Sequence, residues 1–279
     1  MFIVFFFACL WGTPDEVPEP PAPVVEPEPM AADPSPPERA EPELQVDAEL
    51  TRLTNPAVAS QVAEAAAAMN AATTAAELHS AYAKAIVASD ALTEWAQSVE
   101  MGEDLDPITS RAPGITMGWF AEGTAAVFYL DPDDWKAKAA TTTGTDDDTY
   151  FELVDYVYSQ GNPDGWAVWQ MRNWDYGGCS GLGKGVVLES LQKAQAAKQA
   201  GPAFSEEVAQ VRASAIEEIT RTGENLFPRC DVDTMQPMSD DALRSEVQSV
   251  LDTIDLTDAE REALVAIQPK LVGQEFEGG

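Results

Sequence analysis

The glycine-rich stretch 178–185 (GCSGLGKG) contains residue types that hold phosphate groups in other proteins. Backbone N–H groups of glycines can surround a phosphate, a lysine can pair with its charge, and a following Ser or Thr can hold magnesium. In this chain Gly185 stands where that hydroxyl residue belongs, and the polar run 172–176 precedes the loop instead of an apolar strand. The sequence therefore predicts a turn that opens a helix rather than a nucleotide site, and we predict no cofactor.

Two further kinds of residue could support catalysis. Ser180 lies in the same stretch, but a serine nucleophile needs a base within hydrogen-bond reach, and the only histidine, His79, lies far upstream on a predicted amphipathic helix. We interpret His79 as a structural or surface residue, and a single histidine excludes metal sites built from several. The 48 acidic residues include many that could face each other as in a two-carboxylate hydrolase, so this alternative stays open. No metal site is predicted.

Tryptophan is concentrated in the surrounding stretch, residues 162–185, which holds three of the seven in the chain. These rings could form an aromatic platform for a glycan or peptide, or they could fill a core among many small alanines. We favour the core and keep the platform as an alternative. Its candidate ligand-binding residues are Trp166, Trp169, Arg172, Asn173, Trp174, Asp175 and Tyr176.

The net charge of −32 limits the partners of the chain. Affinity for nucleic acids comes largely from Lys and Arg that displace counterions from phosphates, so an acidic surface disfavours it. Attraction to anionic lipids by charge is disfavoured for the same reason. We predict no nucleic-acid partner and interpret most of the charge as an aid to solubility.

The first eleven residues are almost entirely apolar, which suits the core of a secretion signal but is too short to span a bilayer as a helix. Within them, Phe6-Phe7-Ala8-Cys9 resembles the lipobox of bacterial lipoproteins. The resemblance covers only this leader and implies lipidation of Cys9 and attachment to a membrane through the lipid. An ordinary cleaved signal is the alternative. Residues 12–43 contain eleven prolines interleaved with glutamates, a composition that predicts an extended, disordered linker.

The cysteine count agrees with export. If Cys9 is lipidated or removed, Cys179 and Cys230 remain as a pair, which an oxidising periplasm would join in a disulfide. Two unrelated free thiols are the alternative.

Residues 44–279 show frequent helix signals and no alternating series of strands. Asn55-Pro56, the pair Thr74 and Glu77, and the pair Thr257 and Glu260 are typical helix starts, and Ser205 and Ser239 are predicted N-caps. Further predicted helices begin near residue 131 and span 149–159, 186–200, 206–220, 240–253 and 258–269. The run 125–130 (AAVFYL) suits a buried strand or a buried helical turn, and residues 270–279 are predicted to fray.

These patterns predict a leader (1–11), a linker (12–43) and a single domain (44–279) that is mostly α, an irregular multi-helix fold with long loops. The function we expect is an exported, lipid-anchored envelope protein that binds or supports a partner without catalysis. The partner would be an envelope protein or a glycan, and the sequence does not define the oligomeric state. A binder of glycan or peptidoglycan fragments and a carboxylate-based hydrolase are the alternatives.

Overall fold

The structure is a computed structural model that describes residues 48–99, 105–120, 125–158, 166–174, 177–221 and 227–274. All of these belong to one of the two units into which the chain divides, Glu43–Gly279. The leader with Cys9, and the linker predicted at 12–43, lie outside the described residues.

Helices predominate in the described part of the chain, which confirms the mostly α prediction. The helices are α1 (Ala48–Leu53), α2 (Pro56–Ala71), α3 (Ala75–Ser98), α4 (Asp106–Thr109), α5 (Pro132–Ala139), α6 (Asp146–Tyr158), α7 (Val186–Ala200), α8 (Ser205–Thr220), α9 (Asp240–Thr253) and α10 (Asp258–Ile267), followed by the 3-10 turn η1 (Gln268–Lys270). The strands form three antiparallel pairs: β1 (Ile115–Phe120) with β2 (Ala125–Leu130), β3 (Gln170–Trp174) with β4 (Gly177–Ser180), and β5 (Cys230–Asp231) with β6 (Gln236–Pro237).

The predicted helix starts are confirmed with one exception. Asn55 Oδ1 accepts hydrogen bonds from the backbone N–H groups of Ala57 and Val58, each at 3.0 Å, and both predicted capping boxes are present. Ser239 caps α9 as predicted. The prediction for Ser205 is wrong, because α8 begins at Ser205 itself and the cap residue is Phe204, which makes no side-chain cap bond.

Burial of Phe204 explains that correction. Its ring stacks on the ring of Tyr150 with centroids 4.2 Å apart, and its side chain is almost fully buried. The turn before α8 is thus fixed by an aromatic side chain that enters the core, and a hydroxyl cap is not needed to set where the helix begins. Tyr82 and Trp135 belong to the same aromatic cluster, which therefore joins α3, α5 and α6 to the start of α8.

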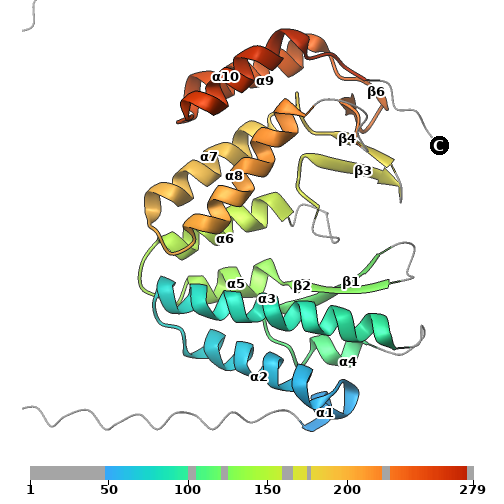
Figure 1. The fold of residues 1–279 in the computed structure, drawn as a ribbon, viewed down its shortest axis with the longest axis vertical. Helices are drawn as coiled ribbons and strands as arrows, with labels where there is room; N and C mark the ends of the chain where they lie inside the picture. Colours follow the sequence, from blue (N-terminus) through green and yellow to red (C-terminus); the bar gives the residue numbers. More distant parts are fainter. Residues whose placement is uncertain are drawn as a thin grey trace, which may run out of the picture. The chain divides into compact units, whose positions relative to one another are not determined.

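The first helices pack closely. The alanine-rich helices α2 and α3 lie side by side and run in opposite directions (Figure 1). The run 125–130 is a strand, β2, whose partner is β1 and which also lies against α3. The hydroxyl of Thr93 on α3 accepts a hydrogen bond from the backbone N–H of Phe128 at 2.9 Å. This backbone donor of β2 therefore has its partner on α3.

The later helices extend the same buried core. Helix α7 packs against α6, α8 and α9, and α10 contacts both α8 and α9. The buried apolar side chains form one cluster that reaches from Leu50 to Leu271. None of the helices in the described ranges is long and apolar enough to cross a membrane.

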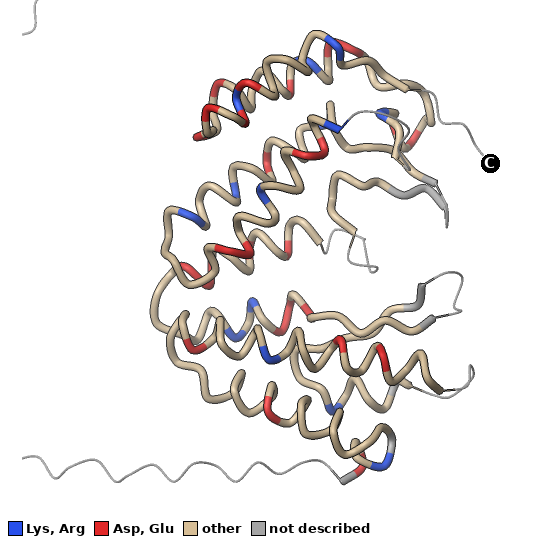
Figure 2. The backbone as a smooth tube through the Cα atoms, viewed as in Figure 1, with Lys and Arg blue, Asp and Glu red and all other residues tan. Residues whose placement is uncertain are grey.

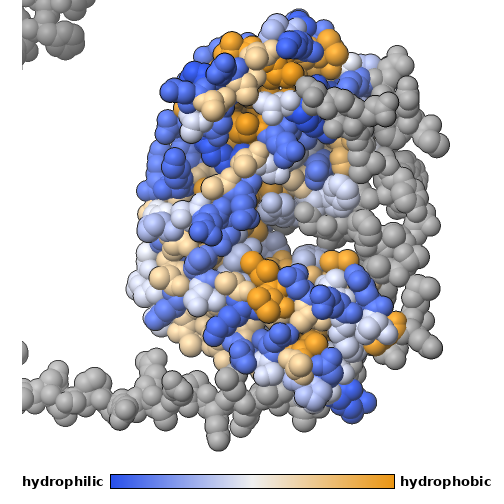
Figure 3. Space-filling view, in the orientation of Figure 1, coloured by the Kyte–Doolittle hydropathy of each residue, from blue (hydrophilic) through white to orange (hydrophobic). Residues whose placement is uncertain are grey.

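Charge and apolar residues are distributed unevenly over the surface. Figure 2 shows acidic residues on most of the described helices, with basic residues scattered among them. Figure 3 shows a largely hydrophilic face with an apolar patch over α3, the helix on which Ile86 and Val87 are exposed.

Candidate functional site

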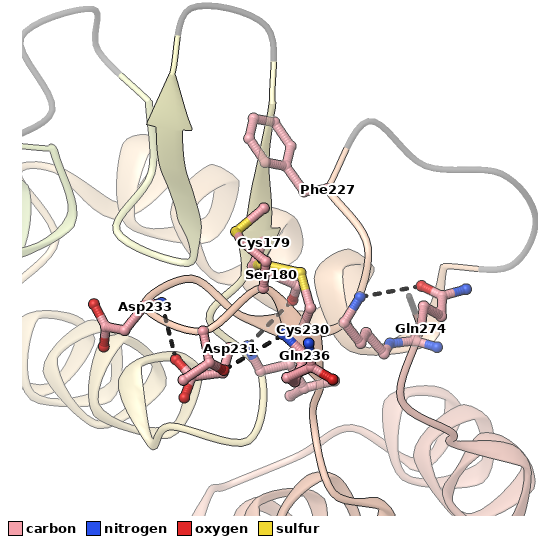
Figure 4. The surroundings of a disulfide bond; sticks show 12 residues. Cys179, Ser180, Phe227, Cys230, Asp231, Asp233, Gln236 and Gln274 are labelled. Atoms are coloured by element: carbon pink, nitrogen blue, oxygen red, sulfur yellow. Dashed lines mark hydrogen bonds between the residues drawn. A yellow bond between two sulfur atoms is a disulfide. The ribbon is translucent and has the colours of Figure 1, made fainter. Parts of the chain in front are cut away.

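The glycine-rich stretch begins on β4 and is tied to a second segment by a disulfide (Figure 4). Cys179 of β4 is bonded to Cys230 of β5, with Cα atoms 5.0 Å apart, as the cysteine count predicts. Both cysteines are fully buried. The backbone N–H of Ser180 also donates to Pro228 O at 2.7 Å, so backbone and side-chain links together hold β4 against the segment around Cys230.

After β4 the chain turns sharply into α7 by way of two glycines in the left-handed region. Gly183 has a φ of +97° and Gly185 a φ of +89°, conformations that side chains disfavour. At Gly183 a Cβ atom would also come within 2.7 Å of Met238. The turn therefore favours glycine at both positions, and at Gly183 close packing against Met238, just before the cap residue of α9, requires it as well.

The N–H groups that this turn exposes are occupied by a carboxylate of the same chain. Glu246 of α9 accepts from Gly183 N and Gly185 N through Oε2, the latter at 3.1 Å, and from Leu188 N through Oε1 at 2.9 Å. Only 6% of Glu246 is exposed. Because the free N–H groups at a helix start attract anions, Glu246 takes the place that a phosphate occupies in phosphate-binding loops.

Lys184, the lysine of the stretch, is also engaged. Its Nζ lies 2.7 Å from Asp231 Oδ1 and 3.4 Å from Asp233 Oδ2. Its pKa is raised: partial burial acts to lower it, but the hydrogen bond and charge of Asp231 outweigh that effect. The ion pairs direct the lysine toward the β5–β6 turn.

Ser180 belongs to a buried ionic cluster that sequence reasoning did not identify. Its hydroxyl donates to Glu218 of α8 and accepts the backbone N–H of Leu182 at 3.1 Å. Glu218 pairs with Arg221 at 2.8 Å, while Arg229 donates to the carbonyls of Ile219 and Arg221 at the end of α8. Burial raises the pKa of Glu218, although Arg221, the Ser180 hydrogen bond and Arg229 all act to lower it.

The structure does not pair Ser180 with His79. The imidazole Nε2 of His79 lies 2.8 Å from Glu207 Oε1, and the ring packs edge-on against Phe204. The Ser180 hydroxyl has Glu218 as its acceptor and is fully buried, so it presents no surface to a substrate. Ser180 and His79 therefore both have structural partners.

Trp169 is not available to the aromatic platform that the sequence leaves as an alternative to the core. Its side chain is 2% exposed and belongs to the core, which leaves it no surface for a ligand, and Ala167 and Val168 beside it are buried as well. Trp166 is half-buried and packs edge-on against Phe227, with ring centroids 5.1 Å apart.

The remaining platform candidates are not placed by the structure. Arg172, Asn173 and Trp174 lie on β3, but their side chains are outside the described set, and Asp175 and Tyr176 fall outside the described residues altogether. The stretch forms a hairpin, β3–β4, with an irregularity between Arg172 and Trp174.

Two acidic residues at the start of α6 are engaged within the fold. No group of three or more His, Cys, Asp or Glu residues in the described ranges is placed to hold a metal ion. Asp146 accepts the backbone N–H of Ala203 at 3.3 Å, and Asp147 accepts the hydroxyl of Thr142. These acids therefore fix the loop before α6 and the turn before α8.

Compared with known proteins, the chain matches no family model, no curated protein and no solved structure.

Proposed function

We propose that this chain is an exported, lipid-anchored envelope protein whose helical body binds or supports a partner without catalysis. The observation behind the non-catalytic part of the proposal is the position of Glu246, which fills the anion site that the glycine-rich loop would otherwise offer to a phosphate. Lys184 and Ser180 are engaged within the fold in the same way. The groups of this loop that could do chemistry therefore stabilise the fold.

The buried disulfide supports export. Disulfides persist in oxidising compartments and are rare where thiol reductants are abundant. Cys179 and Cys230 pair with each other, which leaves Cys9, within the apolar leader, as the third cysteine of the chain. Lipidation of Cys9 would then provide the membrane attachment.

The proposal is tested by following the lipid. The full chain with a C-terminal tag is expressed in a bacterium supplied with labelled palmitate, beside Cys9→Ser and a Cys179→Ala/Cys230→Ala double variant. We expect label and membrane association in the wild type and the double variant, and loss of both in Cys9→Ser. A wild type that is secreted without label would show an ordinary cleaved signal, and a Cys9→Ser variant that keeps its label would place the lipid elsewhere. Either result refutes the anchor at Cys9.

The absence of catalysis is tested on the same purified protein. It is incubated with peptidoglycan, and the soluble products are separated by mass, with Glu218→Gln and a heat-unfolded sample beside it. We expect no product above the unfolded sample. Release of fragments by the wild type would support the hydrolase alternative instead, and its loss in Glu218→Gln would place the reaction at the buried carboxyl.

A further inference from the structure

The turn between β5 and β6 contains a backbone conformation that its residue type disfavours. Met235 has a φ of +54° and is the non-glycine residue with positive φ in the described ranges. Its backbone N–H donates to Asp231 O at 2.7 Å, which closes the turn. Such positions normally hold Gly, Asn or Asp, because the left-handed conformation crowds a larger side chain. A methionine here requires a reason other than turn formation.

The side chain of Met235 supplies that reason, because it contacts the disulfide. Its Sδ lies 3.9 Å from Cys179 Sγ, and the residue is half-buried while both cysteines have no exposed surface. Methionine is long, unbranched and polarizable, so it fills irregular space against sulfur well. Glycine or asparagine at this position would satisfy the turn and leave that side of Cys179 without this cover.

The turn is also held firmly in place over the bond. Met238 N, just after β6, donates to Arg229 O at 2.9 Å, and Asp231 at the start of the turn pairs with Lys184 of the glycine-rich loop. These links hold both ends of the turn from which the Met235 side chain reaches the disulfide.

We propose that Met235 shields the Cys179–Cys230 disulfide from thiols, and that the unfavourable backbone conformation is retained because this shield needs a long side chain. In reduction, a thiolate attacks one disulfide sulfur and forms a mixed disulfide, while the other sulfur leaves with the electron pair as a thiolate and takes a proton from water. A second thiolate then attacks the mixed disulfide, which releases the remaining cysteine and the oxidised reagent. Met235 acts on the first attack by restricting access to Cys179 Sγ.

Reduction by dithiothreitol under native conditions tests this proposal. Wild type, Met235→Gly and Met235→Leu are incubated with the reagent, and samples taken over time are quenched with acid and labelled with a maleimide to count free thiols by mass. We expect Met235→Gly to be reduced about tenfold faster than wild type, since local opening then suffices for attack. Met235→Leu keeps a bulky cover and should stay within about twofold of wild type.

A matched-stability control separates access from unfolding. The urea midpoint of each protein is measured, and the more stable of wild type and Met235→Gly is also reduced in enough urea to match the stability of the other. Faster reduction of Met235→Gly at matched stability supports the shield. Equal rates at matched stability, no acceleration in Met235→Gly, or Met235→Leu reduced as fast as Met235→Gly would each overturn it.

Discussion

Replacing Glu246 of α9 with alanine is expected to be the single change that most destabilises the glycine-rich loop. The carboxylate accepts three backbone N–H groups, from Gly183, Gly185 and Leu188, and it is almost fully buried. Hydrogen bonds to a charged group contribute about 1.5–3 kcal/mol each, and they are not additive when they share one acceptor group. Removing all three and leaving the donors without a partner should cost about 3–5 kcal/mol.

The assay is urea unfolding followed by circular dichroism. With a slope of about 2 kcal/mol per molar urea, Glu246→Ala should lower the midpoint by about 2 M. Glu246→Gln keeps one acceptor oxygen but loses the charge, so about half that effect is expected. Asp252→Ala changes an exposed acid of the same helix, whose carboxylate accepts a hydrogen bond from Gln248, and should stay within about 0.5 kcal/mol of wild type.

Inorganic phosphate extends the test to the anion site itself. If the loop attracts anions, phosphate should partly replace the missing carboxylate in Glu246→Ala. A dissociation constant of about 10 mM would give about 1.4 kcal/mol at about 100 mM phosphate, measured against sodium chloride of equal ionic strength. A Glu246→Ala midpoint within about 0.5 kcal/mol of wild type would refute the role of Glu246, and equal effects of phosphate on wild type and variant would refute the anion site.

Three other predictions concern contacts elsewhere in the fold. Cys179→Ala/Cys230→Ala removes a bond between residues 51 apart and should cost about 4 kcal/mol, measured by the urea midpoint against oxidised wild type. Ser239→Ala removes the cap of α9 and should cost about 1 kcal/mol, whereas Ser205→Ala, which has no cap bond to lose, should change the midpoint little. Glu218 has a pKa raised above its ordinary 4.5. Its contribution to stability is therefore fully present at more acidic pH and is lost as pH rises through the raised value. In urea unfolding, the stability of wild type relative to Glu218→Gln should be lower at pH 7 than at pH 4.

The local parts of this fold could be predicted because their signals lie within a few residues. The capping boxes at Thr74 and Thr257 and the Asn55-Pro56 start each set a helix through contacts of up to three residues, and the apolar stripes set which face is buried. The paired strands were harder to predict, because β3 and β4 depend on links such as Ser180 N to Pro228 O that join distant parts of the chain.

The partners of the glycine-rich loop could not be predicted from the loop alone. Its pattern indicates a turn with free N–H groups, but the acceptor comes from α9, some 60 residues later. A signal for that acceptor was present in the sequence of α9. Glu246 lies on the stripe of Leu243, Val247 and Val250, all of which are buried, and an acid on an apolar stripe needs a partner when the helix packs.

Glu218 follows the same rule on α8. It lies on the stripe of Val211, Ala215 and Ile219, and its partners are the Ser180 hydroxyl and Arg221. Both acids thus bind the glycine-rich stretch, each from a different helix. Glu218 contacts its β4 end through Ser180, and Glu246 contacts its end at the start of α7. A glycine-rich loop with two such acids elsewhere in the chain is therefore better interpreted as the point where helices are joined than as a site for an external phosphate. The Glu246→Ala and phosphate measurements distinguish these two interpretations directly.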